Sequence, residues 1–308
     1  MIIWRISRPE PDAAPTTFTV AIPTHNRREL LLLAVESAQR QTRPPRQILV
    51  VADGCSDGTQ EAVVALRDER VELLDLPKAY AVGYANRDEA VRRARGDVIA
   101  WLADDDLILP GHLAELGAIY DAGGVDLVQA SACVVHEDDA LSPLGMDWRV
   151  PYYRGLMLKG QNRTPASAVS HRRRLVVEAG GWPAGKRRRG DQDLWQRMLL
   201  AGVSTSMAPA PTVLHFRAAW RDQAYRDRVS QGRRFLDRMQ SRDDLARLRS
   251  EMGLAAQRQA AAQERRRKRL LLGIPHLRAR AMLRIRFREA IKDGRLRTPL
   301  ASRRRSGT

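Results

Sequence analysis

The sequence lacks several features that mark common classes of protein. Its 308 residues contain no run of about 18 apolar residues, so no membrane-spanning helix is expected. The N-terminus, Met1 to Arg5, lacks the long apolar segment of a secretion signal. Only two cysteines are present, Cys55 and Cys133, which excludes a disulfide framework. Together these absences predict a cytoplasmic protein in a reducing compartment.

Acidic residues are scarce in one part of the chain only. Residues 217–308 carry 27 basic and 9 acidic side chains, whereas residues 1–216 carry 26 basic and 27 acidic ones. The net charge of +17 therefore resides entirely in the last third. A basic segment of this kind predicts an anionic partner, such as a membrane surface, a nucleic acid or an acidic polymer. Few aromatic side chains are interleaved with the arginines, Phe235 and Phe287 among them, so base stacking is weak and nucleic acid is not the expected partner.

Residues 17–125 alternate between short apolar runs and amphipathic segments. The pattern predicts strands at 18–22, 47–52, 71–76 and 97–102, and helices over 27–40, 59–69, 84–95 and 110–122. Four strand–helix repeats with short connections predict a doubly wound, mostly parallel α/β sheet. In such sheets, ligands bind beyond the carboxyl ends of the strands.

The remaining pattern suggests three parts. Residues 1–16 form a proline-containing leader, residues 17–216 one α/β domain, and residues 217–308 a basic, mainly helical C-terminal extension. The domain continues with strands near 126–135, 165–170 and 210–216, and with a helix over 190–201. Residues 277–288 favour an amphipathic helix flanked by arginines. Two interpretations stay open: it lies on an anionic membrane, or it belongs to a tail that packs on the domain.

Polar side chains follow the first, second and fourth predicted strands. They are Thr24, His25 and Asn26, then Asp53, and then Asp104 to Asp106. Because the carboxyl ends of parallel strands share one edge, these groups should gather there. Asn26 also fits the N-cap of the first helix.

Three acidic groups carry the candidate chemistry. Asp104 to Asp106 either share a divalent cation such as Mg²⁺ with substrate phosphates or cap the helix near Pro110. Asp53, in a glycine-containing turn, either accepts hydrogen bonds from a base or ribose or simply belongs to a tight turn. Asp191 either faces a cleft or caps the helix that follows it.

Five motifs occur in a fixed order along the chain. They are Val20–Asn26, Asp53–Thr59, Gly96–Asp106, Gly180–Trp182 and Asp191–Arg197. This ordered set resembles the inverting family 2 glycosyltransferases of the GT-A fold over about residues 17–216. The resemblance implies a GT-A sheet with a nucleotide-binding edge and does not cover residues 217–308.

The resemblance also implies roles for the matching residues. Six residues match the segments that hold the nucleotide: Pro23, Thr24, His25, Asn26, Asp53 and Arg87. Among them, Asp53 matches the carboxylate that reads a uracil-type base, and Arg87 matches a basic residue near the nucleotide. Asp104 matches the position near the ribose. Asp105 matches a ligand of the Mg²⁺ or Mn²⁺ that bridges the donor diphosphate, with Asp106 assisting. Asp191 matches the general base.

Some positions depart from the family pattern. Ala103 and Gly190 stand where many members have Asp and Glu, and Cys55 replaces a common Ser. His215 lies where some GT-A enzymes supply a further metal ligand; the alternative is a histidine packed at a strand end. Lys186 to Arg189 precede Asp191 where relatives have an acceptor loop, which indicates an anionic acceptor or donor phosphate.

The sequence therefore predicts a metal-dependent inverting glycosyltransferase. It would move a sugar from a nucleotide-sugar donor to a hydroxyl of a glycan or lipid-linked acceptor, in cell-envelope polysaccharide synthesis at the inner face of the membrane. A carboxylate base would take the acceptor's proton, and the metal would neutralise the leaving diphosphate. Two alternatives remain: a nucleotidyltransferase on a similar sheet, for which Thr24-His25-Asn26 is a poor phosphate loop, and nucleic-acid binding through the arginine-rich tail.

Overall fold

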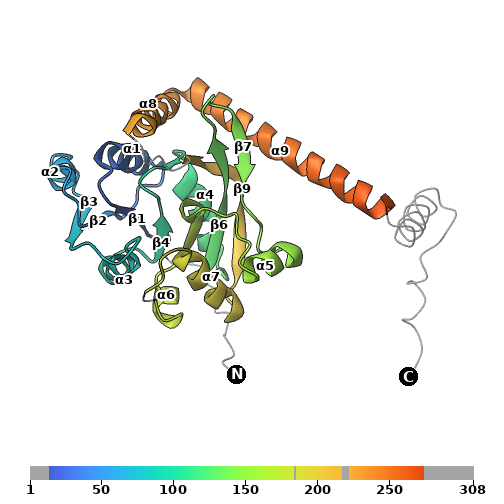
Figure 1. Ribbon diagram of the computed structural model, residues 1–308, viewed down its shortest axis with the longest axis horizontal. Coiled ribbons are helices and arrows are strands. Elements are labelled where there is room, and N and C mark those ends of the chain that lie inside the picture. The colour runs from blue at the N-terminus through green and yellow to red at the C-terminus, as the bar shows by residue number, and fades with distance from the viewer. Residues whose placement is uncertain (1–13, 184, 217–221, 274–308) are drawn as a thin grey trace. The chain divides into compact units, whose positions relative to one another are not determined.

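A computed structural model describes residues 14–183, 185–216 and 222–273 (Figure 1). The strands are β1 Phe18–Thr24, β2 Gln47–Asp53, β3 Val71–Leu76, β4 Val98–Trp101, β5 Leu107–Ile108, β6 Leu127–Val135, β7 Leu141–Leu144, β8 Val169–Arg172 and β9 Thr205–Phe216. The helices are α1 Arg28–Gln39, α2 Thr59–Val64, α3 Tyr84–Arg93, α4 His112–Asp121, α5 Pro151–Leu158, α6 Arg174–Glu178, α7 Gly190–Leu200, α8 Asp222–Arg238 and α9 Arg242–Gly273.

The strands of the described residues form one sheet in the order β3-β2-β1-β4-β8-β6-β9-β5, with β7 paired to β6. The first four strands in this order are parallel, as the alternation of strands and helices predicts. β8 runs antiparallel to β4 and β6, and β6 is parallel to β9. The chain builds outward from β1 to β3 and then returns to place β4 on the other side of β1. The strand order therefore reverses between β1 and β4, which is where a doubly wound sheet binds its ligand.

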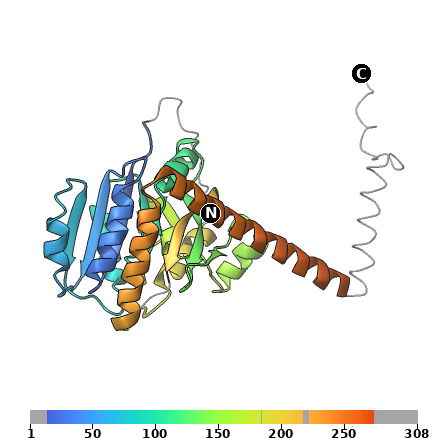
Figure 2. The ribbon, with the colours of Figure 1, turned by 90° about the horizontal axis from the view of Figure 1, so that it is seen from above.

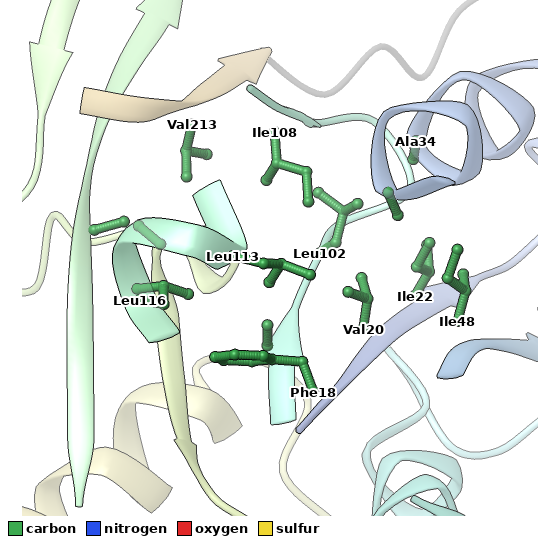
Figure 3. Close-up of a cluster of buried hydrophobic side chains, with 14 of the residues drawn as sticks. Phe18, Val20, Ile22, Ala34, Ile48, Leu102, Ile108, Leu113, Leu116 and Val213 are labelled. Atoms are coloured by element: carbon green, nitrogen blue, oxygen red, sulfur yellow. The ribbon is translucent and has the colours of Figure 1, made fainter. Parts of the chain in front are cut away.

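Side-chain alternation along the strands fills a core on each face of the sheet. Phe18, Val20 and Ile22 of β1 pack with Leu113 of α4 on one face (Figure 3). α1 and α2 contribute to the same face. Ala21 and the intervening residues of β2 and β4 pack on the other face with α3, α5, α6 and α7. Because both faces are covered, the central strands are apolar throughout, and β2 is buried along its whole length.

α8 and the start of α9 belong to the same compact unit as the sheet. Phe235 and Leu236 of α8 are buried with Leu30 and Leu33 of α1, and Phe216 at the end of β9 stacks edge-on against Phe235. Figures 1 and 2 both show α8 lying beside α1. The compact unit reaches Ala256, so the predicted boundary after residue 216 does not coincide with its edge. The compact unit extends past residue 216 because α8 has an apolar face that packs on the domain. The many charged residues of this segment obscure that face in the sequence.

Other sequence predictions differ from the structure in detail. The predicted helix at 59–69 ends at Val64, and β7 lies between the strands expected at 126–135 and 165–170, where no strand was predicted. The strand expected at 165–170 is a 3₁₀ turn, Ala166–Ala168, followed by β8. α5 was not predicted because it is only eight residues long; Met157 is its one buried residue, and Tyr153, Leu156 and Leu158 are partly buried against the same core.

Two predictions lie on residues outside the described ranges. They are most of the leader at 1–16 and the amphipathic helix at 277–288. Among the residues that the structure does describe, no helix is long and apolar enough to cross a membrane.

Candidate active site

A pocket of about 340 Å³ opens at the carboxyl edge where the strand order reverses. Its lining includes seven of the predicted site residues: Pro23, Thr24, His25, Asp53, Arg87, Asp104 and Asp105. Four other predicted residues, Asn26, Asp106, Asp191 and His215, do not line it. The expectation that ligands bind at the carboxyl ends of the parallel strands therefore located most of the candidate residues, because β1, β2 and β4 end side by side.

Hydrogen bonds tie the ends of β1 and β4 together at the pocket floor. The Thr24 hydroxyl donates to Asp104 Oδ2 at 2.8 Å. Arg27 Nη1 donates to Asp104 Oδ1 at 3.0 Å and to Asp105 Oδ2 at 3.1 Å. Both carboxylates are less than one-tenth exposed. One guanidinium therefore serves two buried carboxylates.

Asp53 lies at the opposite wall in a dense set of donors. Its Oδ1 accepts from Ala79 N and Asn86 Nδ2, both at 2.7 Å, and its Oδ2 accepts from Lys78 Nζ at 2.6 Å. Gly83 closes this wall with φ +74°, and a Cβ there would lie 2.5 Å from Asp53 Oδ2. Only glycine fits that position, in space and in backbone angle. The carboxylate is held rigidly, with an acceptor position left on Oδ2.

The electrostatics of the aspartate cluster are unbalanced. Burial and the neighbouring charges of Asp104 and Asp106 together raise the pKa of Asp105 to about 7, against the opposing effect of Arg27. Burial also raises the pKa of Asp104, although Arg27 and Thr24 oppose the change. The cluster thus holds more negative charge than its one neighbouring guanidinium neutralises.

These residues fit a divalent cation in chemistry and in charge. Asp104 and Asp105 offer hard carboxylate oxygens, and their raised pKa values show that another cation would be accommodated. Within the described ranges, no three His, Cys, Asp or Glu side chains are arranged to hold a metal by themselves. Mg²⁺ commonly takes one or two carboxylates and completes its shell with water and substrate phosphates, so two aspartates suffice.

Asp106 points away from the pocket into a separate network. Its side chain is 1% exposed and accepts from Ser167 Oγ at 2.5 Å and from Phe216 N at 3.0 Å. His215 Nδ1 lies 3.0 Å from Asp106 Oδ1. Burial lowers the pKa of His215, but the Asp106 carboxylate outweighs burial and raises it overall. The contacts favour a histidine that packs at a strand end, and the metal roles of Asp106 and His215 stay predictions.

Asp191 connects to the pocket through Arg87. Arg87 Nη1 donates to Asp191 Oδ1 at 2.5 Å, and the indole N–H of Trp182 donates to the same oxygen at 2.8 Å. Trp182 is held by an edge-on contact with Trp101, whose ring centroid lies 5.1 Å away. Oδ2 of Asp191 has no hydrogen-bond partner among the described residues. The two hydrogen bonds to Oδ1 therefore orient the carboxylate, and Oδ2 is left available to accept another hydrogen bond.

Gly190 has a packing reason that the sequence did not reveal. A Cβ at this position would lie 2.6 Å from the ring of Tyr84, and Gly190 N donates to the Tyr84 hydroxyl at 2.8 Å. Tyr84 thus occupies the space that a larger side chain before Asp191 would need. This accounts for the departure from the Glu that many family members have there.

Sequence reasoning missed several pocket residues. Lys78 and Asn86 were not selected. Lys78 lies just beyond the carboxyl end of β3, as Asp53 lies at the carboxyl end of β2, so the same reasoning about strand ends applied to β3 would have found Lys78. Arg27 was passed over beside Asn26. Asn26 itself is not an N-cap: it has φ +54°, Arg27 takes the N-cap position, and Asn26 Oδ1 accepts from Ser56 N at 2.8 Å.

Comparison with known proteins assigns the family. The model of glycosyl transferase family 2 matches residues 19–173, about half of the chain. The chain belongs to glycosyl transferase family 2. The family match covers the pocket residues of β1 to β4 and ends before Asp191 and His215. It favours the glycosyltransferase prediction over the nucleotidyltransferase and nucleic-acid-binding alternatives.

Curated relatives of this family 2 chain act in polysaccharide synthesis. The chain is 34% identical over 131 residues to the succinoglycan biosynthesis protein ExoO of Rhizobium meliloti, which is 42% of this chain and 37% of that protein. It is 35% identical over 101 residues to the GalNAc(5)-diNAcBac-PP-undecaprenol beta-1,3-glucosyltransferase of Campylobacter jejuni, 32% of each chain. The matches thus span about a third of each relative.

Solved structures agree on the fold. S. aureus TarS in complex with UDP-GlcNAc superposes with a TM-score of 0.57 at 16% identity, over 72% of this chain and 70% of that one. The GT-A fold expected from the sequence motifs is thereby confirmed.

Proposed function

We propose that this protein is an inverting glycosyltransferase that moves a sugar from a nucleotide-sugar donor to a hydroxyl of a glycan or lipid-linked acceptor. One observation carries the proposal: the donor-site carboxylates Asp53, Asp104 and Asp105 line one pocket, and Arg87 in its wall contacts Asp191. The guanidinium of Arg87 thus links the nucleotide pocket to the candidate base, Asp191.

The donor nucleotide would lie along the pocket from Asp53 to Asp104. The fixed Asp53 carboxylate keeps an acceptor position for the N–H of a uracil-type base, and the hydrogen bond from Lys78 holds the carboxylate in place. Asp104, anchored by Thr24, would accept from a ribose hydroxyl. Arg27 and Arg87 both line the pocket and would face the diphosphate.

Asp104 and Asp105 would hold a Mg²⁺ or Mn²⁺ ion together with the donor diphosphate. When bound, such an ion neutralises the charge that develops on the leaving diphosphate. The chain's own cations, Arg27 and Arg87, would add to that neutralisation from either side of the phosphates.

Asp191 would act as the general base. Arg87 and Trp182 both donate to Oδ1, which leaves Oδ2 to take the proton of the attacking hydroxyl. Attack in one step, on the face opposite the leaving diphosphate, inverts the anomeric configuration. Because the displacement takes place in one step, no second carboxylate is needed as a nucleophile to form a covalent intermediate.

The names of the relatives support a role in cell-envelope polysaccharide synthesis, with the enzyme at the inner face of the membrane. The basic C-terminal extension supports the membrane location, since each basic residue near an anionic surface contributes about 1 kcal/mol.

A thermal-shift screen of nucleotide-sugars with Mn²⁺ tests the proposal. At least one donor should stabilise the full chain only when Mn²⁺ is present, and Asp105→Ala should abolish that stabilisation. Absence of any nucleotide response in the screen would refute the proposal.

A further inference from the structure

The path of the acceptor to Asp191 does not run through the donor pocket. Arg87 lines the pocket and contacts Asp191 from that side, while Asp191 itself is outside the lining. The Asp191 side chain is nevertheless 22% exposed. An acceptor hydroxyl must therefore arrive from outside the pocket, over the surface around the first turn of α7.

That surface is strongly basic. We use the term basic rim for six exposed side chains on the loop after α5 and the loop before α7: Lys159, Arg163, Lys186, Arg187, Arg188 and Arg189. The two loops contact each other, because Arg189 Nη1 donates to the carbonyl of Gly160 at 3.5 Å. Gln196 of α7 also donates to the carbonyl of Met157 at 2.9 Å, which fixes the end of α5 alongside α7 (Figure 1).

The fold does not neutralise this charge. Within the basic rim, Lys186 pairs with Asp193 at 2.7 Å, and the other five side chains form no ion pair with the described residues. Residues 1–216 as a whole carry a net charge of −1. The basic rim is therefore a local concentration, in contrast to a domain that is otherwise slightly acidic.

Five exposed cations without an ion pair to the described residues, beside a candidate base, favour an anionic partner. Like charges held in neighbouring loops repel one another, and an arriving anion relieves that repulsion and is steered to the site. Arginine predominates, and its planar fork matches the oxygens of phosphate and carboxylate groups. In the proposed function the donor diphosphate would lie in the pocket that Arg87 lines, and none of the six side chains of the basic rim lines that pocket.

We propose that the acceptor is an anionic glycan, whose own phosphate or carboxylate groups bind the basic rim and so bring a nearby hydroxyl to Asp191. This inference rests on the proposed function, since it assumes that Asp191 faces the acceptor.

The test compares two double variants of the full chain. Arg187→Glu/Arg188→Glu reverses two charges of the basic rim. Arg46→Glu/Arg67→Glu makes the same change in charge on exposed arginines that precede β2 and β3, at the opposite edge of the sheet. The probes are a short poly(glycerol phosphate) oligomer and neutral maltohexaose, titrated by calorimetry with UDP and Mn²⁺ present. The C-terminal extension is identical in all three proteins.

The unmodified protein should bind the phosphate oligomer more tightly than maltohexaose. Arg187→Glu/Arg188→Glu should weaken that binding about tenfold, equivalent to 1.4 kcal/mol, and Arg46→Glu/Arg67→Glu by less than about twofold. Equal binding by the unmodified protein and the basic-rim variant would overturn the inference.

A vesicle arm separates the acceptor from a membrane surface. If Arg187→Glu/Arg188→Glu reduced binding to phosphatidylglycerol vesicles but left oligomer binding unchanged, the basic rim would be a membrane contact and the inference would be wrong. Thermal stabilisation by each nucleotide-sugar of the screen with Mn²⁺ is measured in parallel. Absence of any such response from all three proteins would refute the proposed function, whereas a response with unaltered oligomer binding refutes only the anionic acceptor.

Discussion

Asp105 should lower the stability of the ligand-free protein at neutral and alkaline pH. Its pKa is about 7 in the folded protein against an ordinary 3.8, because burial and two neighbouring carboxylates disfavour its charge. A raised carboxyl pKa means that the folded state holds its proton more tightly than the unfolded state. The folded protein is therefore most stable, as far as Asp105 is concerned, below about pH 4, where this carboxyl group is protonated in both states. That stability is lost as the pH rises through 7.

The magnitude follows from the difference between the two pKa values. At about 1.4 kcal/mol for each pKa unit, ionisation of Asp105 costs the folded state about 4 kcal/mol at pH 8. That is a large share of the 5–15 kcal/mol that typically holds a domain together. Asp105→Asn keeps the shape and removes the charge. It should therefore raise the melting temperature at pH 8 by roughly 10 °C, at about 2–4 °C for each kcal/mol.

Differential scanning fluorimetry of the full chain between pH 4 and 8.5, without metal or nucleotide, measures this effect. The gain from Asp105→Asn should shrink steadily below pH 7 and vanish near pH 4. Asp68→Asn is a control of opposite sign, because hydrogen bonds from Arg70 lower the pKa of Asp68 and its charge stabilises the fold above about pH 4. Equal stability of Asp105→Asn and the unmodified protein at pH 8 would refute the reasoning.

Three further predictions concern the catalytic groups and the tail. Asp191→Asn should keep the stabilisation by nucleotide and Mn²⁺ and lower turnover about 100-fold or more; retained turnover would contradict its role as base. Trp182→Phe removes one donor to Asp191 and should lower kcat about tenfold with an unchanged KM for the donor, and a change in KM alone would argue against positioning. Deletion of residues 274–308, with eleven basic and two acidic side chains, should weaken binding to anionic vesicles, and unchanged binding would place the anchor elsewhere.

The parallel half of the fold and most of the donor site followed from local pattern. Apolar runs such as Gln47–Ala52 mark strands covered on both faces, and the polar residues after them mark one edge. The antiparallel strand β7 and the short helix α5 were not predicted, and the strand expected at 165–170 lies a few residues before β8, because each of these elements is brief and only partly apolar. Their place depends on neighbours that the local sequence does not specify.

α8 shows how composition can mislead. The charge of the last third suggested an extension separate from the domain, yet Val229 and Leu236 lie seven residues apart on one face of α8 and pack in the same cluster as residues of α1 and β9. The apolar spacing was present in the sequence. That this face of α8 is buried depends on α1, whose apolar residues Leu30 and Leu33 pack against it.

The sequence by itself determined the type of protein: an α/β sheet with acidic groups collected at its carboxyl edge, because strand periodicity and topology dictate where strand ends meet. The tertiary structure alone decided which partner each acidic group received. Arg27 bridges Asp104 and Asp105, Asp106 turns away to His215, and Arg87 reaches Asp191 across 104 positions of the chain. Such pairings depend on side-chain geometry between segments that are distant in sequence, so a local pattern of apolar and polar residues cannot predict them.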